Sequence, residues 1–444
     1  MSNTTAKFVD ELGGADDAAQ QSKVFTKVAW RVLPILVLAY LFNYVDRTNI
    51  SVAALQMNKA VGLTASEFGY GAGLLFIGYC LFEIPSNFAL YRFGARIWIA
   101  RIMITWGLVS AAMAFCSGPY SYYALRFLLG VAEAGFFPGV AFYLSYWFPS
   151  GYRARVLAWF LVSIPASSFI GAPVAGLLLK MDGIWGLAGW QWLFLMESLP
   201  CVLIGLVLPR LLPNQPHEAP WLSEQEREIA TRTLTTEEEA LRRKPKVVNN
   251  FVPALFSGRV WLLGLIYLSF STGSYGVQVW LPIIIKGGHF SNTMVSLLVA
   301  IPYLFSVAAM IFGAWYVDRY GKRVLNVILT CAVASGGFIF ALMSHDLVAV
   351  LSSITLALLC LNAARAIFWA IPSLYLTGGA AAGGLALISS IGTLGGFIGP
   401  SVMGWLKDAT GSFTAGLLAM AGFLALASVL AIVLNLTSRV GRTA

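Results

Sequence analysis

The sequence predicts an all-α membrane protein with twelve transmembrane helices, arranged as two pseudo-symmetric six-helix bundles around a central cavity. Three observations predict this fold class. First, 58% of the 444 residues are hydrophobic and only 11% are charged, whereas charged residues make up about a quarter of a soluble domain. Second, apolar stretches of about 20 residues or more, long enough to cross a bilayer as a helix, recur along the chain. Third, segments of the first half of the chain recur in the second half.

The repeat is visible in two pairs of segments. The arginine-containing loops 90–96 and 317–323 lie 227 positions apart, and segments 169–178 and 397–406 share six of ten residues at an offset of 228. Two offsets this close indicate two equivalent halves. The predicted domains are an N-terminal tail (1–27), a first bundle (28–213), a linker (214–250), a second bundle (251–436) and a C-terminal tail (437–444).

Each half contains six apolar spans. Residues 1–22 lack a basic region followed by an apolar core, so no cleavable signal peptide is predicted and the first span serves as the insertion signal. Prolines inside several spans each remove one backbone hydrogen bond and predict bends there. In order, the predicted spans are 28–54, 68–90, 97–117, 120–146, 155–180, 190–212, 257–285, 293–316, 323–343, 347–375, 383–407 and 412–435.

Basic residues gather in alternate loops. Lys27 precedes the first span, and arginines such as Arg92, Arg153 and Arg319 fill every second connection. Because cytoplasmic loops carry an excess of lysine and arginine, both termini and the linker are predicted on the cytoplasmic side of the inner membrane. This asymmetry accounts for the net charge of +9 without a nucleic-acid partner.

The stretch between Pro213 and Phe251 is rich in glutamate, arginine and lysine. This composition predicts a solvated connector between the two bundles. Ser223 followed by Glu226 has the spacing of a capping box, which predicts a short surface helix within the connector.

Several function classes lack their sequence signals. The five cysteines fall inside predicted helices without metal-like spacing, so they are interpreted as core residues. No glycine-rich phosphate-binding loop followed by lysine is present, which argues against ATP-driven transport by this chain. No metal cluster or nucleophile arrangement suggests an enzyme. We therefore expect no cofactor, with a proton gradient as the energy source.

Five ionisable residues lie well inside predicted spans: Asp46, Arg47, Arg126, Glu133 and Arg365. Burying each in a membrane is costly unless it is paired or faces a wet cavity, so each is a candidate functional residue. Arg126 and Glu133 are seven positions apart, which places them on one helix face, roughly 10 Å apart along the axis. Asp46 and Arg47 diverge by about 100° around their helix, so at most one of them points into a cavity.

The chemistry of these residues suggests anion binding coupled to protons. Arg47 offers a fixed fork of donors that suits a carboxylate and stays charged. A buried carboxyl such as Asp46 or Glu133 can carry a proton reversibly, because desolvation penalises its charged form. The alternative is structural: Asp46–Arg126 or Arg126–Glu133 would be permanent ion pairs between the first and fourth helices.

Arg365 gains meaning from the repeat. An alignment with an offset of 232 places it at the position equivalent to Glu133, from which it would hold a second carboxylate or a ring substituent. The alternative is a snorkelling or paired arginine near the cytoplasmic side. Glu83 and Glu197 are expected to form structural ion pairs, Glu83 with a loop arginine. The neutral residues expected to line a pocket as a set are Tyr44, Tyr79, Ser163, Tyr275, Gln278, Trp369, Ser389, Ser390 and Thr393.

Several motifs carry a family resemblance. The loop that contains Asp318, Arg319, Gly321 and Arg323 resembles the signature loop of the major facilitator superfamily. Its counterpart, with Arg92, Gly94 and Arg96, lacks the usual aspartate; both loops are predicted to gate opening. Segments 44–49, 76–87, 132–139 and 147–149 resemble the anion:cation symporters. That branch includes tartrate, phthalate, hydroxyphenylacetate and sugar-acid permeases, and it is related to sialin and vesicular glutamate transporters.

The resemblance implies import of an organic carboxylate together with protons, by alternating access between the two bundles. It implies that Arg47 contacts the substrate carboxylate and that Asp46 and Glu133 couple protons, with Arg126 between them. Relatives often carry asparagine near Ser389, and its absence here, together with Arg365, favours an aromatic acid or a dicarboxylate over a sugar acid.

Two alternatives stay open. The same fold could serve an organic-anion exchanger or a drug-type efflux transporter. A non-transporting membrane receptor is the alternative from a different functional class. The expected partners are a small organic anion, protons and the lipid bilayer, and the expected state is a monomer.

Overall fold

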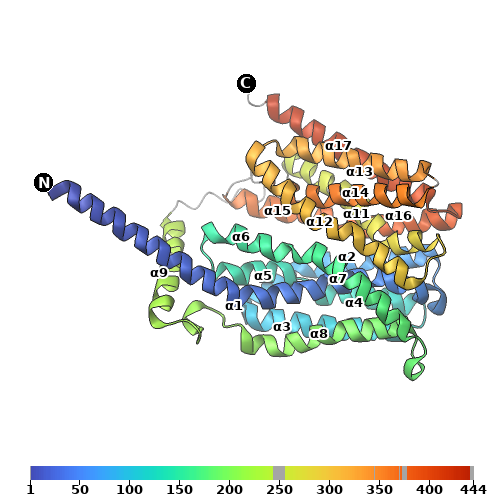
Figure 1. The fold of residues 1–444 in the computed structure, drawn as a ribbon, viewed down its shortest axis with the longest axis horizontal. Helices are drawn as coiled ribbons and strands as arrows, with labels where there is room; N and C mark the ends of the chain where they lie inside the picture. Colours follow the sequence, from blue (N-terminus) through green and yellow to red (C-terminus); the bar gives the residue numbers. More distant parts are fainter. Residues whose placement is uncertain (1, 244–255, 345, 370, 373–377, 441–444) are drawn as a thin grey trace.

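A computed structural model describes residues 2–243, 256–344, 346–369, 371–372 and 378–440. These residues form long helices and no strands, and most of the helices run roughly parallel to one another (Figure 1). Within the described chain, twelve helical segments are long and apolar enough to cross a membrane. These spans confirm the predicted fold class. The prediction was possible because hydropathy and length are read directly from the sequence.

The N-terminal bundle begins with one long helix and ends at the connector. Thr64 and Glu67 form a reciprocal capping box at the start of α2, which satisfies two amides that the helix leaves open. The helices are α1 (Ser2–Val61), α2 (Ala65–Phe93), α3 (Ala95–Ala112), α4 (Pro119–Glu133), α5 (Phe136–Ser145), α6 (Ser150–Leu161), α7 (Ser163–Leu178) and α8 (Gly189–Leu211), with 3₁₀ segments at Met113–Phe115, Leu179–Met181, Ile184–Gly186 and Pro216–Glu218.

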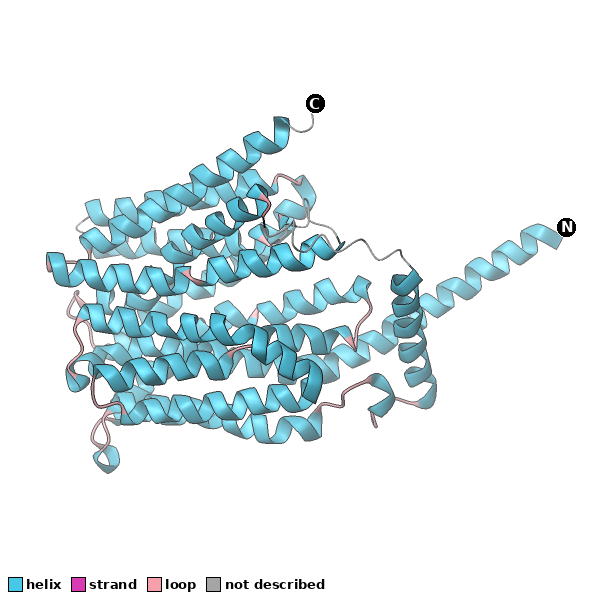
Figure 2. Ribbon diagram, turned by 180° about the vertical axis from the view of Figure 1, so that it is seen from behind, coloured by secondary structure: helices cyan, strands magenta, loops and turns pink. Residues whose placement is uncertain are grey.

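The C-terminal bundle has the same order of long helices. Its members are α11 (Gly258–Lys286), α12 (Asn292–Tyr320), α13 (Arg323–Met343), α14 (Leu347–Phe368), α15 (Gly378–Thr393), α16 (Gly395–Thr410) and α17 (Thr414–Val440). In Figure 2 the two bundles lie one above the other, with α9 (Glu224–Arg243) across one end of the lower bundle.

One predicted boundary is wrong: the tenth span was predicted to reach residue 375, but α14 ends at Phe368, and residues 373–375 lie outside the described part. The fourth span lies at the predicted residues, and its helix is interrupted between α4 and α5. The region predicted as an N-terminal tail, 1–27, is helical from Ser2 onward and continues into the first span.

The two halves share local geometry at equivalent positions. Gly94 ends α2 with a φ of +85° and donates its N–H to Leu90 at 3.0 Å. Gly321 ends α12 with a φ of +70° and donates to Val317 at 2.8 Å. Both glycines and both acceptors are 227 positions apart, and a positive φ favours glycine at each. The loop repeat in the sequence thus corresponds to a repeated helix end.

The bundles contact each other closely at the end away from α9. A Cβ on Gly69 of α2 would lie 2.3 Å from the carbonyl oxygen of Pro400 on α16, and a Cβ on Gly176 of α7 would lie 2.5 Å from Ser296 on α12. The first two amides of α2 donate to the Asp408 carboxylate of α16, at 3.2 and 2.7 Å. Small residues thus let the backbones of the two bundles meet there.

The connector forms the predicted helix α9, which is held to the N-terminal bundle. Ser223 and Glu226 exchange the two hydrogen bonds of a capping box, at 2.8 and 3.2 Å. Glu226 also pairs with Lys27 of α1 at 2.7 Å, and the hydrogen bond from Lys27 lowers the pKa of Glu226 below its usual value. Arg153 and Glu237 form a longer pair at 3.8 Å.

Candidate functional site

Glu133 lies at a break in the fourth span, and this break positions its side chain. It is the last residue of α4; Ala134 leaves the helix at a ψ of 132°, and Gly135 adopts a φ of +85°. A Cβ on Gly135 would lie 2.4 Å from the Ser86 hydroxyl, so the turn requires glycine for space as well as for φ. The Glu133 side chain is fully buried, and its Oε2 lies 2.5 Å from Nε of Arg47.

Arg47 sits among aromatic rings as well as beside Glu133. Its guanidinium carbon lies 4.9 Å from the ring centroid of Tyr79 and 5.4 Å from that of Tyr44, within the range of cation–π attraction. The Arg47 side chain keeps 16% exposure. The structure therefore brings together Arg47, Glu133, Tyr44 and Tyr79, which the sequence placed in one site.

Asp46 points in a different direction from Arg47, as their adjacency predicts. It accepts hydrogen bonds from Trp106 of α3 at 2.7 Å and from Asn49 at 3.0 Å, and also from the hydroxyl of Ser110. Asp46 is 1% exposed. Its carboxylate is thus enclosed between α1 and α3 rather than presented to a cavity.

The alternative in which Arg126 forms a permanent ion pair with Asp46 or Glu133 does not hold among the described residues. One of its nitrogens donates to the Ala72 carbonyl of α2 at 3.2 Å, and its other two find no hydrogen-bond partner among the described residues. Arg126 lies two turns before Glu133, so its guanidinium reaches the backbone of α2 instead of either carboxylate. It acts electrostatically on both Glu133 and Asp46 from beyond ion-pair distance.

Arg365 projects from α14 of the C-terminal bundle. It donates to the Ser274 hydroxyl at 3.1 Å and lies 5.6 Å from the ring centroid of Tyr275. None of the ion pairs within the described chain includes it. α4 and α14 begin 228 positions apart and end 235 positions apart, so the equivalence of Arg365 with Glu133 stays a prediction.

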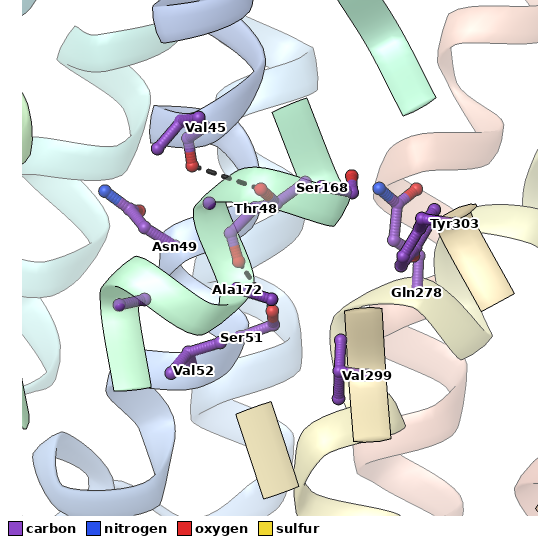
Figure 3. Close-up of a pocket in the computed structure, with 12 residues that line it drawn as sticks. Val45, Thr48, Asn49, Ser51, Val52, Ser168, Ala172, Gln278, Val299 and Tyr303 are labelled. Atoms are coloured by element: carbon purple, nitrogen blue, oxygen red, sulfur yellow. Dashed lines mark hydrogen bonds between the residues drawn. The ribbon is translucent and has the colours of Figure 1, made fainter. Parts of the chain in front are cut away.

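Two adjoining pockets lie between the bundles. Ser168, Gln278 and Tyr303 line both of them, and Arg365 lines the second. Figure 3 shows Gln278 and Tyr303 on one side of the first pocket, with Thr48 and Ser168 on the other. Polar groups from both bundles therefore face a shared space.

The remaining predicted pocket residues contact other side chains or the backbone. The ring centroids of Tyr275 and Phe76, which belong to different bundles, are 4.7 Å apart, and those of Trp369 and Tyr267 are 5.1 Å apart. The Ser163 hydroxyl lies within hydrogen-bond distance of the carbonyl oxygens of Phe160 and Val37, at 2.8 and 3.3 Å. Thr393 donates to the backbone of Ser389 at 2.8 Å, and Ser390 is half-buried on α15.

The predicted gating loops lie at the ends of α2 and α12. Arg92 and Arg319 are exposed, Arg96 is half-buried near the start of α3, and Arg323 begins α13. The side chain of Asp318 lies outside the described part of the structure. Both loops contain a glycine with a positive φ that donates to the residue four positions earlier, and their gating role stays a prediction.

A buried polar cluster beside the site was not predicted. It contains Asn49, Trp106 and Ser110 around Asp46, with Glu197 of α8 close by. One signal could have found it: Asn43, Asp46 and Asn49 follow at intervals of three in an apolar span, which places three polar groups on one helix face. Asn43 is 1% exposed.

Comparison with known proteins adds independent information. Residues 36–400 match the family profile described as the Major Facilitator Superfamily. A relative from Agrobacterium vitis named "Putative tartrate transporter" is 45% identical over 418 residues, covering 94% of this chain and 96% of the relative. A "Quinolone resistance transporter" from Acinetobacter baumannii is 41% identical, covering 89% and 91%.

Among solved structures, a bacterial homologue of the human lysosomal transporter Spinster, in an inward-facing and occupied conformation, superposes with a TM-score of 0.73. It shares 16% sequence identity, with 90% of this chain and 96% of that chain covered. The resemblance establishes the same fold. These matched proteins are transporters rather than enzymes.

Proposed function

Because this chain belongs to the Major Facilitator Superfamily, we propose that it imports a small organic carboxylate together with protons. A dicarboxylate of the tartrate type is the favoured substrate class, with an aromatic acid next and a sugar acid third. Transport of this superfamily type is established by the match; the proton and the carboxylate are the proposal.

One observation carries the proposal: the contact between Arg47 and Glu133, with Thr48, the residue after Arg47, lining a pocket between the bundles. An ionised Glu133 neutralises Arg47 and competes with any substrate carboxylate for its donors. A proton on Glu133 removes that competitor and leaves Arg47 as an uncompensated cation. The substrate carboxylate then replaces Glu133 as its partner, so proton binding and substrate binding favour each other.

Arg365 supports a second carboxylate on the substrate. It lines one pocket from the C-terminal bundle, and the structure gives it a hydroxyl partner, Ser274, and aromatic neighbours. A half-buried guanidinium without a counter-ion is unfavourable, and a dianion that reaches both Arg47 and Arg365 supplies one. The relative named for tartrate, a dicarboxylate, fits this arrangement. The Tyr44 and Tyr79 rings would also suit an aromatic acid.

Membrane voltage constrains the number of protons. Moving one charge against the interior-negative potential costs about 2.3 kcal/mol per 100 mV. A monoanion with one proton crosses without net charge, whereas a dianion needs two protons for the same balance. Dicarboxylate import therefore calls for more than one proton-binding group.

The packing between the bundles supports alternating access. We place both termini and α9 on the cytoplasmic side of the inner membrane, because the basic loops lie there. The contact of Gly69 with Pro400 and that of Gly176 with Ser296 then close the outer side. Residues 28–213 and 251–436 would rock about the site, and opening outward requires these glycine contacts to part.

Uptake into proteoliposomes tests the proposal. Radiolabelled tartrate, phthalate and gluconate would be offered to the purified protein with and without an inward proton gradient, beside Arg47→Ala. We expect tartrate to accumulate only with the gradient and Arg47→Ala to abolish accumulation. Absence of uptake of all three acids by the wild type would overturn the carboxylate assignment.

Drug efflux is the second candidate, favoured by the relative named for quinolone resistance. The same assay separates it from import. Inside-out vesicles that accumulate a fluoroquinolone when acidified inside, with no tartrate transport, would establish efflux. Tartrate uptake without fluoroquinolone transport would exclude it.

A further inference from the structure

Glu197 on α8 is a buried carboxyl group that the mechanism above does not use. Its side chain is 5% exposed, and neither carboxyl oxygen has a hydrogen-bond partner in the described part of the chain. The structural ion pair expected for it is absent from the pairs that the described residues form. An ionised carboxylate in this position is strongly unfavourable, whereas a protonated one carries its own donor.

Three side chains with polar atoms neighbour Glu197. Asn49 and Asp46 of α1 lie beside its carboxyl group, and Cys201 lies one turn further along α8. Asn49 donates its side-chain amide to Asp46, and its own Oδ1 finds no donor among the described residues. Asn49 and Glu197 thus present three oxygen acceptors without a donor. A proton on Glu197 supplies one.

The charge balance of the N-terminal bundle points the same way. Arg47 is engaged by Glu133, and Arg126 acts on Glu133 and Asp46. The half-buried Glu83 adds an acid beside Arg47 rather than a base. The ionisable side chains of α1, α4 and α8 at the centre of the bundle are three acids and two bases, and one proton on Glu197 balances their charges. They are Asp46, Glu133, Glu197, Arg47 and Arg126.

Asn49 connects this cluster to the space between the bundles. It lines the first of the two pockets between the bundles, together with Thr48 and Ser168. In Figure 3 its amide points away from Gln278 and Tyr303, and it donates to Asp46. A proton that enters the pocket therefore meets a polar route past Asn49 toward Asp46 and Glu197.

We propose that Glu197 is a second proton-carrying residue beside Glu133, and that it holds its proton in this conformation. The inference rests on the proposed function and deepens it, because it assigns the additional proton that a dicarboxylate requires. Glu133 takes up one proton when Arg47 turns to the substrate. Glu197 carries the other, taken from the outer solution and released inside.

Infrared spectra of the purified protein at neutral pH test where the proton resides. The C=O band of protonated carboxylic acids is expected to lose the intensity of one residue in Glu197→Gln and to stay unchanged in the control Glu226→Gln, because Glu226 is ion-paired with Lys27. An unchanged band in Glu197→Gln would overturn the proposal, whatever the protein transports. Glutamine resembles a protonated glutamate in shape, so this variant should fold. If it does not, Glu197→Asp gives the same readout as a shifted band.

The coupling ratio tests whether that proton moves with the substrate. We expect wild-type proteoliposomes to take up two protons per tartrate, so that an interior-negative potential leaves accumulation unchanged. Glu197→Gln should take up one, and a potential of 100 mV should then reduce accumulation about fiftyfold. A ratio of two in both proteins would overturn the proposal. If the wild type shows no gradient-driven uptake, the proposed function fails, and the infrared result alone decides the protonation of Glu197.

Discussion

Arg47 and Glu133 form an ion pair, Nε to Oε2 at 2.5 Å, that joins α1 to the last residue of α4. The pair lies where the fourth span breaks, so the carboxylate is presented by a helix end rather than by a continuous helix. A guanidinium held in this way must be released before it can bind a substrate carboxylate. Protonation of Glu133 is the simplest release, and the following predictions depend on it.

Glu133→Gln should remove one of the two protons that accompany tartrate. The amide resembles the protonated acid, so Arg47 stays available and tartrate binds at every pH. We expect exchange of internal for external tartrate to persist, while the number of protons taken up per tartrate falls from two to the one that Glu197 carries. Counterflow and the proton-to-tartrate ratio in the same proteoliposomes measure both, and Glu133→Asp, which keeps the carboxyl group, is the control. A ratio of two in Glu133→Gln would contradict the role of Glu133.

Arg365 should set the preference for a second carboxylate. Loss of a charge-assisted hydrogen bond costs about 1.5 to 3 kcal/mol, so Arg365→Gln should weaken tartrate binding by about tenfold to a hundredfold. Binding of a monocarboxylate such as lactate should change little. Arg365→Lys keeps the charge but loses the fork, so an intermediate effect is expected. Equal loss for tartrate and lactate, measured by competition for uptake, would argue for a structural role.

Gly69→Ala should open the sealed end of the molecule. The new Cβ would lie 2.3 Å from the Pro400 carbonyl oxygen, so the two bundles must separate there. Overpacking of this kind costs about 1 to 3 kcal/mol. Amide hydrogen exchange of the first turn of α2, whose N–H groups donate to Asp408, should accelerate about fivefold to a hundredfold.

The matched control for this variant is Gly118→Ala at the start of α4, where a Cβ meets nothing within 4 Å. Its exchange in α2 should equal that of the wild type. Unaltered exchange in Gly69→Ala would mean that the α2–α16 contact does not hold this end closed.

The contact between α1 and α9 should depend on pH. The hydrogen bond from Lys27 lowers the pKa of Glu226 in the folded protein. The contact therefore adds stability above the ordinary glutamate pKa of about 4.3, and that stability is lost as the pH falls through the lowered folded value. Hydrogen exchange in α9 should rise over that acidic range in the wild type, and Glu226→Gln should show the faster exchange already at neutral pH. A pH-dependent step that survives in Glu226→Gln would contradict this assignment.

The sequence predicted the transmembrane spans well because hydropathy and length are local properties. The loop repeat was equally informative, since Gly94 and Gly321 end their helices with the same hydrogen bond. The break after Glu133 was not predicted, because Gly135 stands in an apolar run that reads as one helix.

The sequence could not predict which charged side chains pair with each other inside the membrane. Which acid meets Arg47 depends on how α1 and α4 are rotated against each other, and hydropathy carries no information on that rotation. Glu197 was expected to be paired for the same reason. The structure instead leaves its carboxyl oxygens without a partner among the described residues.

Proton uptake on substrate binding tests the central claim most directly. Calorimetric titration of the purified protein with tartrate, in two buffers of different ionisation enthalpy at neutral pH, gives the number of protons taken up. We predict that the wild type takes up one proton when Arg47 exchanges Glu133 for tartrate, and that Glu133→Gln binds tartrate with no uptake. Binding without proton uptake by the wild type, or equal uptake by both proteins, would contradict the account.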